Sequence, residues 1–177
     1  MTEPRISVRE GVERALRHWP AAYGLALQLT GERAAAEDLC QEAYLRLCRK
    51  KSPFREEGSL RAYVLTTVRN VAKDMAGGRP AALDFREMEA DLAAVAMVSD
   101  PVRVSTRGEE RRRVTRAVER LPSPWRAALY LRDGLDLSYG EIALILDTTD
   151  DVVRTTLHRA RNRVREMLQR MEAGNEP

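Results

Sequence analysis

The sequence predicts an all-α protein made of two small helical domains. Its 177 residues are 44% hydrophobic but only 5% aromatic, and the helix-favouring residues Ala, Leu, Arg and Glu are frequent. Apolar residues recur at three- and four-residue spacing in two blocks, and a stretch with weaker periodicity separates them. We therefore expect a first domain over residues 8–77, a flexible linker over 78–106 and a second domain over 107–172.

The first block contains a predicted amphipathic helix from Val12 to Ala26, strained by Pro20. The pair Thr30-Gly31 breaks this helix, and another begins after it. Its apolar stripe comprises Ala35, Leu39, Ala43 and Leu47. Four polar residues lie off that stripe: Asp38, Gln41, Glu42 and Arg46. A polar face of this kind is either a docking surface or simply solvated.

A third helix is predicted after the loop "KKSPFREEG", with Ser59 as its N-cap. Its apolar face comprises Leu60, Tyr63, Val64, Thr67, Val68, Val71, Ala72 and Met75, and "AGGRP" ends it. The linker that follows has more acidic than basic residues. Within it, Phe85, Met88, Leu92 and Val95 suggest a short helical turn or two.

The second block begins near Arg107 with a helix that ends at Pro122. Ser123 as N-cap and Pro124 at the first helical position predict a new helix, and "DGLDL" turns the chain. Ser138 and Glu141 form a capping-box pattern for the next helix. After the turn "DTTDD", a last helix has a predicted inner face of Val153, Leu157, Ala160, Val164 and Leu168.

The outer face of the last helix is strongly basic, with five arginines and no acid between Val152 and Arg165. The capped helix, tight turn and longer basic helix have the spacing of a helix-turn-helix, in which the second helix enters the DNA major groove. A solvated basic face is the alternative. A membrane-surface helix would carry larger apolar residues than these. The face comprises Arg154, Thr155, His158, Arg159, Arg161, Asn162 and Arg165.

Several other classes of protein are disfavoured. The polar N-terminus is unlike a signal peptide, and the chain lacks the apolar run of a membrane span. We therefore expect a cytoplasmic protein. Cys40 and Cys48 are interpreted as small buried apolar residues, and we expect no metal, cofactor or small-molecule substrate. We find no phosphate-binding loop or activated nucleophile, and therefore expect no enzyme. The net charge of +3 and the isoelectric point of about 9.1 allow a polyanion site by local clustering.

Three stretches carry a family resemblance. "LTGERAAAEDLCQEAYLRL" and "GSLRAYVLTTVRNVAKD" resemble the second conserved domain of the extracytoplasmic-function sigma factors, small bacterial initiation factors of the sigma-70 family. "VERLPSPWRAALYLRDGLDLSYGEIALILDTTDDVVRTTLHRARNRVREML" resembles their fourth domain. From the start of the first stretch to the end of the last, the resemblance spans about three quarters of the chain and follows the family's order. The resemblance implies a factor that binds core RNA polymerase and directs promoter-specific initiation, without catalysis of its own.

The resemblance also implies roles for residues of the first domain. Asp38, Gln41, Glu42 and Arg46 would dock on the clamp helices of the polymerase. The following loop and helix would melt the proximal promoter element and read its bases. The candidates for this role are Phe54, Arg55, Arg61, Arg69, Asn70 and Lys73. Asn70 could equally brace its own helix.

In the second domain, the resemblance implies that the last helix reads the distal promoter element. The candidates are Arg154, Thr155, His158, Arg159, Arg161 and Arg165. Some positions depart from the family pattern: Met75 to Gly78 replace basic residues, Tyr63 replaces a common Trp, and Asp147 replaces a common Gly. Thr156 stands where the family has an arginine. The distal element could therefore differ in sequence or be bound less tightly.

Family members are commonly held inactive by an anti-sigma factor, often membrane-embedded, so the resemblance implies such a partner beside core polymerase and promoter DNA. The alternative is a free-standing helix-turn-helix regulator that binds DNA without polymerase. Such a regulator would not need the first block in this form.

Overall fold

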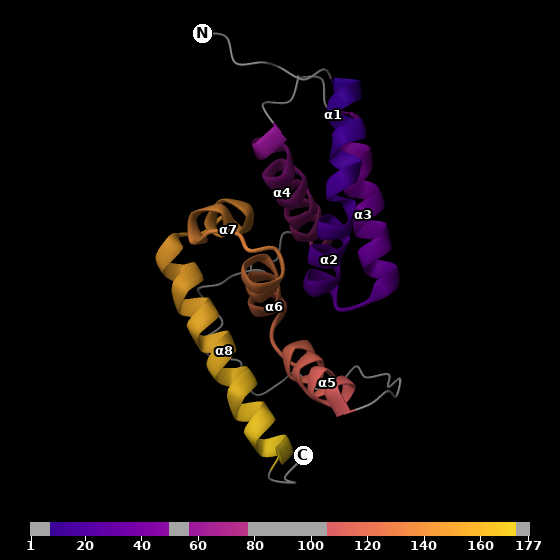
Figure 1. Cartoon of the computed structure of the whole chain (residues 1–177). Coiled ribbons are helices and arrows are strands. Elements are labelled where there is room, and N and C mark those ends of the chain that lie inside the picture. Colours follow the sequence, from indigo (N-terminus) through magenta and orange to yellow (C-terminus); the bar gives the residue numbers. More distant parts are fainter. Residues whose placement is uncertain (1–7, 50–56, 78–105, 173–177) are drawn as a thin grey trace.

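The computed structural model describes residues 8–49, 57–77 and 106–172, and every regular element in these ranges is helical (Figure 1). This confirms the predicted all-α class and its two domains. The first domain comprises α1 (Val8–Ala15), η1 (Leu16–His18), α2 (Trp19–Thr30), α3 (Arg33–Cys48) and α4 (Glu57–Met75). The second comprises α5 (Thr106–Glu119), α6 (Ser123–Leu129), η3 (Tyr130–Gly134), α7 (Tyr139–Leu146) and α8 (Asp150–Glu172).

The single helix expected from Val12 to Ala26 is divided, which corrects the prediction. A 3₁₀ turn, η1, separates α1 from α2. Pro20 then lies in the first turn of α2, where its missing N–H group costs no helical hydrogen bond. The apolar spacing is preserved across the break, and for this reason the sequence pattern does not reveal it.

Helices α2, α3 and α4 pack together in the first domain. The predicted stripe of α3 is largely correct, because Leu39, Ala43 and Leu47 are all buried. Helix α2 ends at Gly31, whose φ of 76° is left-handed and whose N–H donates to the Leu27 carbonyl. Helix α4 begins at Glu57, so Ser59 lies within the helix and is not its N-cap.

The second domain corrects one helix start and adds an element. The N-cap of α6 is Pro122, whose carbonyl accepts from the N–H groups of Trp125 and Arg126, so Ser123 is already inside the helix. Helix α6 then widens into the π-helical turn η3, in which the Leu135 N–H donates to the Tyr130 carbonyl at 3.0 Å. No sequence pattern predicted this turn.

The helix-turn-helix itself follows the prediction closely. The Ser138 hydroxyl accepts from the Glu141 N–H, and the Glu141 carboxylate accepts from the Ser138 N–H at 2.8 Å, which completes the capping box of α7. Asp147 ends α7 with a left-handed φ of 56°. In α8 the predicted inner residues Val153, Leu157 and Ala160 are buried, whereas Val164 and Leu168 are half-buried.

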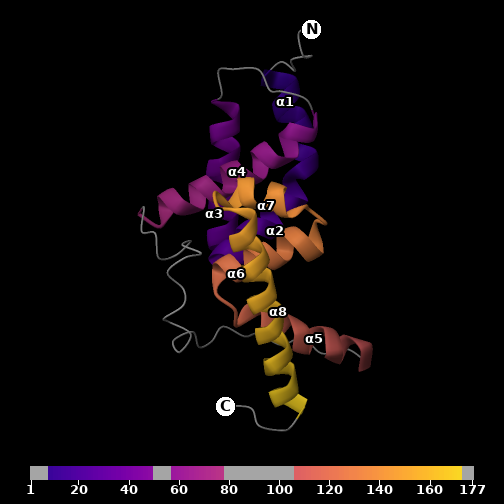
Figure 2. The same cartoon turned by 90° about the vertical axis from the view of Figure 1, so that its left-hand side faces the viewer.

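The two domains pack directly against each other. Helix α2 contacts α6 and η3, and α4 contacts α7, and both views show this arrangement (Figures 1 and 2). Buried residues of both domains belong to one apolar cluster. The predicted linker lies outside the described residues over 78–105.

Candidate nucleic-acid and partner interfaces

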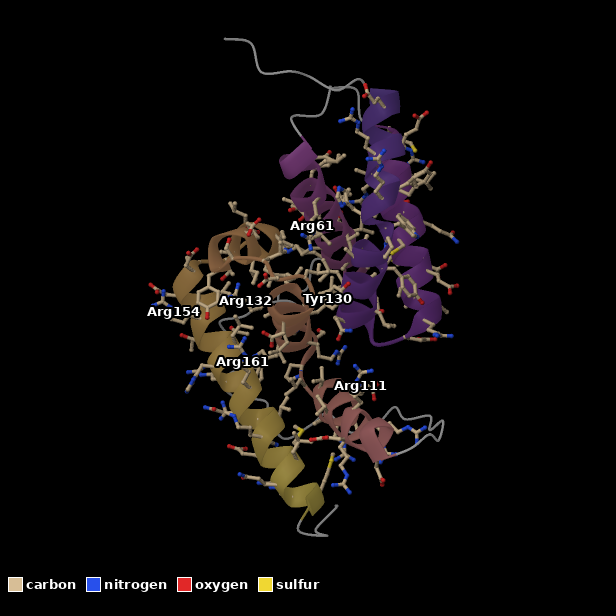
Figure 3. All side chains as sticks on the ribbon, viewed as in Figure 1. Arg61, Arg111, Tyr130, Arg132, Arg154 and Arg161 are labelled. Atoms are coloured by element: carbon tan, nitrogen blue, oxygen red, sulfur yellow. The ribbon has the colours of Figure 1, made fainter. Side chains whose placement is uncertain are left out.

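The outer face of α8 is the most basic surface that the sequence analysis identified. Five of its residues are exposed: Arg154, Thr155, His158, Arg159 and Arg165. Arg154 extends outward from the first half of α8 (Figure 3). Because α8 follows a capped helix and a tight turn, this face is oriented as in a recognition helix. Guanidinium groups on such a face suit both phosphate contacts and bidentate contacts with guanine.

Arg161 differs from its neighbours on this face because it is only half-exposed. Its Nη2 donates to the Asp133 carboxylate of η3 at 2.6 Å, and this hydrogen bond is the main cause that raises the pKa of Arg161. Arg161 therefore links α8 to η3 within the domain. Any contact with DNA must compete with Asp133 or be shared with it.

Tyr139, at the start of α7, lies between two arginines. The Arg132 guanidinium is 5.4 Å from the centre of the Tyr139 ring, and that of Arg154 is 5.9 Å from it. Both distances allow cation–π attraction. Arg132 and Tyr139 were not predicted from the sequence, because their proximity to Arg154 depends on how η3 and α7 pack against α8. The contact with Tyr139 links exposed Arg154, in the first turns of α8, to the start of α7.

Three polar residues of α8 form a short chain along the exposed face. The Asn162 amide Nδ2 lies 3.0 Å from His158 Nε2, and Arg165 donates to the Asn162 carbonyl oxygen at 2.5 Å. The spacing of four and three residues places them one turn apart on one face. Asn162 thus orients both neighbours, although the sequence analysis gave it no role of its own.

Thr156 is 4% exposed and faces the interior of the domain. The family resemblance predicts that an arginine is lost at this position. Thr156 itself therefore lies off the exposed basic face of α8.

The candidate docking face lies on α3, where Asp38 and Gln41 are exposed. Glu42 and Arg46 are half-buried, and Arg46 donates to Glu42 at 3.1 Å and to Asp74 of α4 at 2.6 Å. These hydrogen bonds raise the pKa of the Arg46 guanidinium, the bond to Asp74 being the larger cause. The four residues do share one side of α3, but Arg46 braces the helix pair as well.

Leu45 belongs to the same face and was missed by the sequence analysis. Its side chain is 45% exposed, and it follows Gln41 by one helical turn. An exposed leucine among polar residues is typical of the apolar centre of a docking surface. The sequence could have indicated this residue, because Leu45 is apolar but lies outside the predicted apolar stripe of the helix.

The candidate residues for the proximal element on α4 differ in how exposed they are. Asn70 and Lys73 are exposed, whereas Arg61 is half-buried and Arg69 is only 7% exposed. Arg61 donates to the Leu135 carbonyl of the second domain at 3.0 Å, and it lies between α4 and that domain in Figure 3. Arg69 also contacts the Asn70 amide oxygen at 3.0 Å, in agreement with the bracing alternative for Asn70. Phe54 and Arg55 lie outside the described residues.

The cysteines are only partly as expected. Cys40 is buried, and burial raises its thiol pKa to about 11, which makes it a poor nucleophile. Cys48 is exposed at the end of α3, so the interpretation of both residues as buried was wrong for Cys48. Within the part of the chain that the structure describes, no cluster of three potential metal ligands occurs, and no helix is long and apolar enough to cross a membrane.

Comparisons with known proteins match both domains. Residues 14–79 match the family Sigma-70 region 2, and residues 111–164 match Sigma-70, region 4. The ECF RNA polymerase sigma-E factor of Escherichia coli K12 is 32% identical over 144 residues, which cover 75% of each chain. The RNA polymerase sigma-H factor of Pseudomonas aeruginosa is 28% identical over 174 residues, covering 92% of this chain and 90% of that one.

A solved structure has the same fold. It contains the sigma factor RpoE of Bartonella quintana in complex with the anti-sigma factor NepR, with a TM-score of 0.65 and 22% identity over 89% of this chain and 95% of that one. Two domain matches in the expected order and a relative above 30% identity agree with the helix-turn-helix and its basic face. The chain therefore belongs to the extracytoplasmic-function sigma factors of the sigma-70 family, which act in transcription initiation.

Proposed function

We propose that this sigma factor binds core RNA polymerase through α3, captures the melted proximal promoter element through α4, and reads the distal element through α8. The observation that carries the proposal is the exposed basic face of α8, on the second of two domains that match sigma regions 2 and 4 in order. A free-standing regulator would not need the first domain in this form.

Core binding is assigned to the α3 face that contains Asp38, Gln41, Glu42, Leu45 and Arg46. We expect Asp38→Ala and Gln41→Ala to weaken binding to core polymerase, because both side chains are exposed and make a polar rim around Leu45. Glu110→Ala is the control, since Glu110 is also exposed but lies on α5 of the second domain. Normal core affinity in both variants would contradict the assignment.

Capture of the melted strand is assigned to α4, with Phe54 and Arg55 of the preceding loop as further candidates. Exposed Lys73 and Asn70 are available for contact. Arg61 and Arg69 would extend the basic path along the helix once their present partners are released. A cationic groove with base contacts is the usual way to hold single-stranded DNA.

The distal element is assigned to Arg154, Thr155, His158, Arg159, Arg161 and Arg165 of α8. We expect Arg159→Ala to lower promoter-dependent transcription and to leave core binding intact, because Arg159 is exposed on α8, away from the α3 face. Arg170→Ala is the control, since Arg170 is exposed in the last turn of the same helix. Loss of core binding in Arg159→Ala would contradict the division of roles.

The mechanism involves binding energy and specificity, with no bond chemistry on this chain. Each phosphate that an arginine neutralises releases counterions, so promoter affinity falls as salt concentration rises. Because the two domains are joined in one chain, binding of one raises the effective concentration of the other at its own site. An anti-sigma factor is a further proposed partner. The likeness to a sigma factor solved with such a partner supports the fold of both domains rather than this contact.

Multi-round transcription tests the whole proposal. The purified chain is added to bacterial core polymerase with DNA from upstream of its own gene, and a discrete start site that depends on the protein is expected. Absence of a transcript together with absence of core binding would contradict the proposal. Binding of duplex DNA by the chain alone would then identify a free-standing regulator.

A further inference from the structure

Three side chains on the outer face of α8 form a hydrogen-bonded chain in which every donor and acceptor can be assigned. Arg165 Nη1 lies 2.5 Å from Asn162 Oδ1, and Asn162 Nδ2 lies 3.0 Å from His158 Nε2. A guanidinium group only donates, so the amide atom beside Arg165 must be the oxygen. The other amide atom is therefore the NH2 group, which also only donates. His158 Nε2 must accept that hydrogen bond.

The direction of this chain fixes the tautomer of His158. A neutral imidazole has one N–H group and one bare nitrogen, which is the acceptor. The hydrogen bond at one ring nitrogen decides which nitrogen carries the proton. Because Nε2 accepts from Asn162, the proton of the ring is on Nδ1. His158 therefore carries an N–H donor at Nδ1, while its acceptor nitrogen is occupied by a residue of its own helix.

His158 lies where a recognition helix meets the edges of bases. Helix α8 begins at Asp150, and His158 is exposed about two turns from that start. This stretch of α8 lies between the labelled Arg154 and Arg161 in Figure 3. Recognition helices contact bases through residues of their N-terminal half. The arginines around His158 suit phosphate contacts, which leaves the imidazole available for a base.

The major groove offers only a few acceptors to a single N–H donor. Guanine presents N7 and O6, adenine presents N7, and thymine presents O4, whereas cytosine presents a donor. The hydrogen bond to Asn162, one turn further along, holds the tip of the His158 ring along the helix. The imidazole therefore does not extend fully into the groove. N7 is the purine acceptor nearest to the phosphate backbone, so it is the one within reach of a ring held in this way.

We propose that His158 is a specificity-determining residue of the distal element that donates from Nδ1 to N7 of a purine, and that Asn162 and Arg165 position it. This inference rests on the proposed role of α8 in reading that element. Asn162 acts through His158 and needs no DNA contact of its own. A guanidinium group has five N–H groups, so Arg165 can hold Asn162 and contact a phosphate at the same time.

The first test determines the tautomer of His158 in the full-length chain. Nitrogen NMR shifts of the imidazole groups are measured in mildly alkaline buffer, and a His158→Phe variant assigns the signals of the two histidines. We expect the proton on Nδ1 in the wild type and in the control Gln169→Ala, whose exposed amide lies further along α8. Asn162→Ala should revert to the form with the proton on Nε2, which free histidine favours. A wild type in that second form would overturn the inference.

The second test measures base reading by the holoenzyme, in which the chain is bound to core polymerase. Promoter duplexes carry 7-deazaguanine or 7-deazaadenine at one purine of the distal element at a time, so that a C–H group replaces N7. We expect one such replacement to weaken wild-type binding about fivefold, as loss of a single hydrogen bond requires.

The variants show whether that loss depends on His158. The same replacement should have no effect on binding by His158→Phe, which keeps a ring but lacks the donor. Non-additivity of this kind identifies a direct interaction between the two groups that were changed. Asn162→Ala should respond less than the wild type, and Gln169→Ala should respond fully. An equal response of Asn162→Ala and the wild type would overturn the positioning role of the amide.

The outcomes also separate this inference from the function on which it rests. If the wild-type holoenzyme binds the promoter no better than a duplex with a scrambled distal element, the proposed role of α8 is wrong and the inference fails with it. If that discrimination is intact but each replacement affects the wild type and His158→Phe equally, His158 reads no purine N7. In that case only the inference is wrong.

Discussion

At the scale of single residues, Thr156 shows how a position on the recognition helix is assigned to core or surface. Thr156 is buried, whereas the adjacent Thr155 is exposed. We predict that Thr156→Arg lowers the free energy of unfolding by about 3 kcal/mol, because an unpaired charge would be buried in the second domain. Urea unfolding of the full chain measures this change.

Thr155→Arg is the control for this prediction. Its side chain would extend into solvent, so we expect a change in the free energy of unfolding within about 0.5 kcal/mol and tighter non-specific DNA binding. If Thr156→Arg were as stable as Thr155→Arg and also bound DNA more tightly, position 156 would belong to the DNA face.

Gly31 carries a second prediction at this scale. Its left-handed φ of 76° ends α2, and an added Cβ would be 3.2 Å from Nη2 of Arg126. We expect Gly31→Ala to lower the melting temperature and to cost about 1 kcal/mol, because L-residues with a side chain resist this conformation. Differential scanning fluorimetry measures the shift. An unchanged melting temperature would show that the end of α2 can rearrange without cost.

Individual residues were predictable from the sequence where one local rule decides them. Asp147, at the left-handed end of α7, is an example, because Asp accepts a positive φ more readily than most residues and the family resemblance implies a common glycine there. Arg69 was placed on the correct helix, but its burial depends on a partner 77 residues away. Local periodicity holds no information about such a partner.

At the scale of elements, the capping box of α7 links structure to pH. Hydrogen bonds from the Ser138 side chain, and then from its backbone, lower the pKa of Glu141 below its ordinary value of 4.5. Because the folded-state pKa is depressed, the stabilisation is complete above about pH 4.5. It is lost as pH falls through the folded-state pKa.

We therefore predict that the stability difference between wild type and Glu141→Gln shrinks as pH falls below 4.5. The neutral amide of the Glu141→Gln variant does not titrate, so the stability of the variant lacks the pH dependence that ionisation of Glu141 gives the wild type. Thermal unfolding across the acidic range measures the difference. Ser138→Ala, which removes the cap itself, should cost about 1 kcal/mol at neutral pH. A pH-independent difference for Glu141→Gln would contradict the charge-assisted cap.

Other elements were harder to predict, and the reason is physical. The apolar spacing of the first helix continues through η1, so the hydrophobic pattern cannot distinguish one helix from three segments. The π-helical turn η3 lies where the second domain contacts α2, and its Tyr130 donates to Ala21, 109 positions away. In contrast, the "SYGE" start of α7 depends on residues three positions apart and was predicted correctly.

At the scale of the whole molecule, the two domains could be predicted and their contact could not. Each domain has its own amphipathic helices and turn signals. The contact between them joins residues such as Arg126 and Gln28, which are 98 positions apart, and Arg61 and Leu135, which are 74 apart. It also depends on the absence of a side chain at Gly24. None of these features has a signature in local spacing.

This contact leads to a prediction about cooperativity. Since one apolar cluster includes buried residues of both domains, exposing one domain removes packing from the other. We predict that the wild-type chain unfolds in a single calorimetric transition, with equal calorimetric and van't Hoff enthalpies. Gly24→Leu should instead show two transitions, because the added side chain separates α2 from Tyr130 while each domain keeps its own helices.

The control for cooperativity is Gly140→Ala, which leaves the boundary unchanged and should retain the single transition. Scanning calorimetry of the three full-length chains provides the comparison. Two transitions in the wild type would show that each domain is stable alone, and that the contacts between the domains add little coupling. A single transition in Gly24→Leu would show that the shared apolar cluster tolerates the added side chain. If only Gly24→Leu shows two transitions, the contact between Tyr130 and α2 at Gly24 is what makes the two domains unfold together.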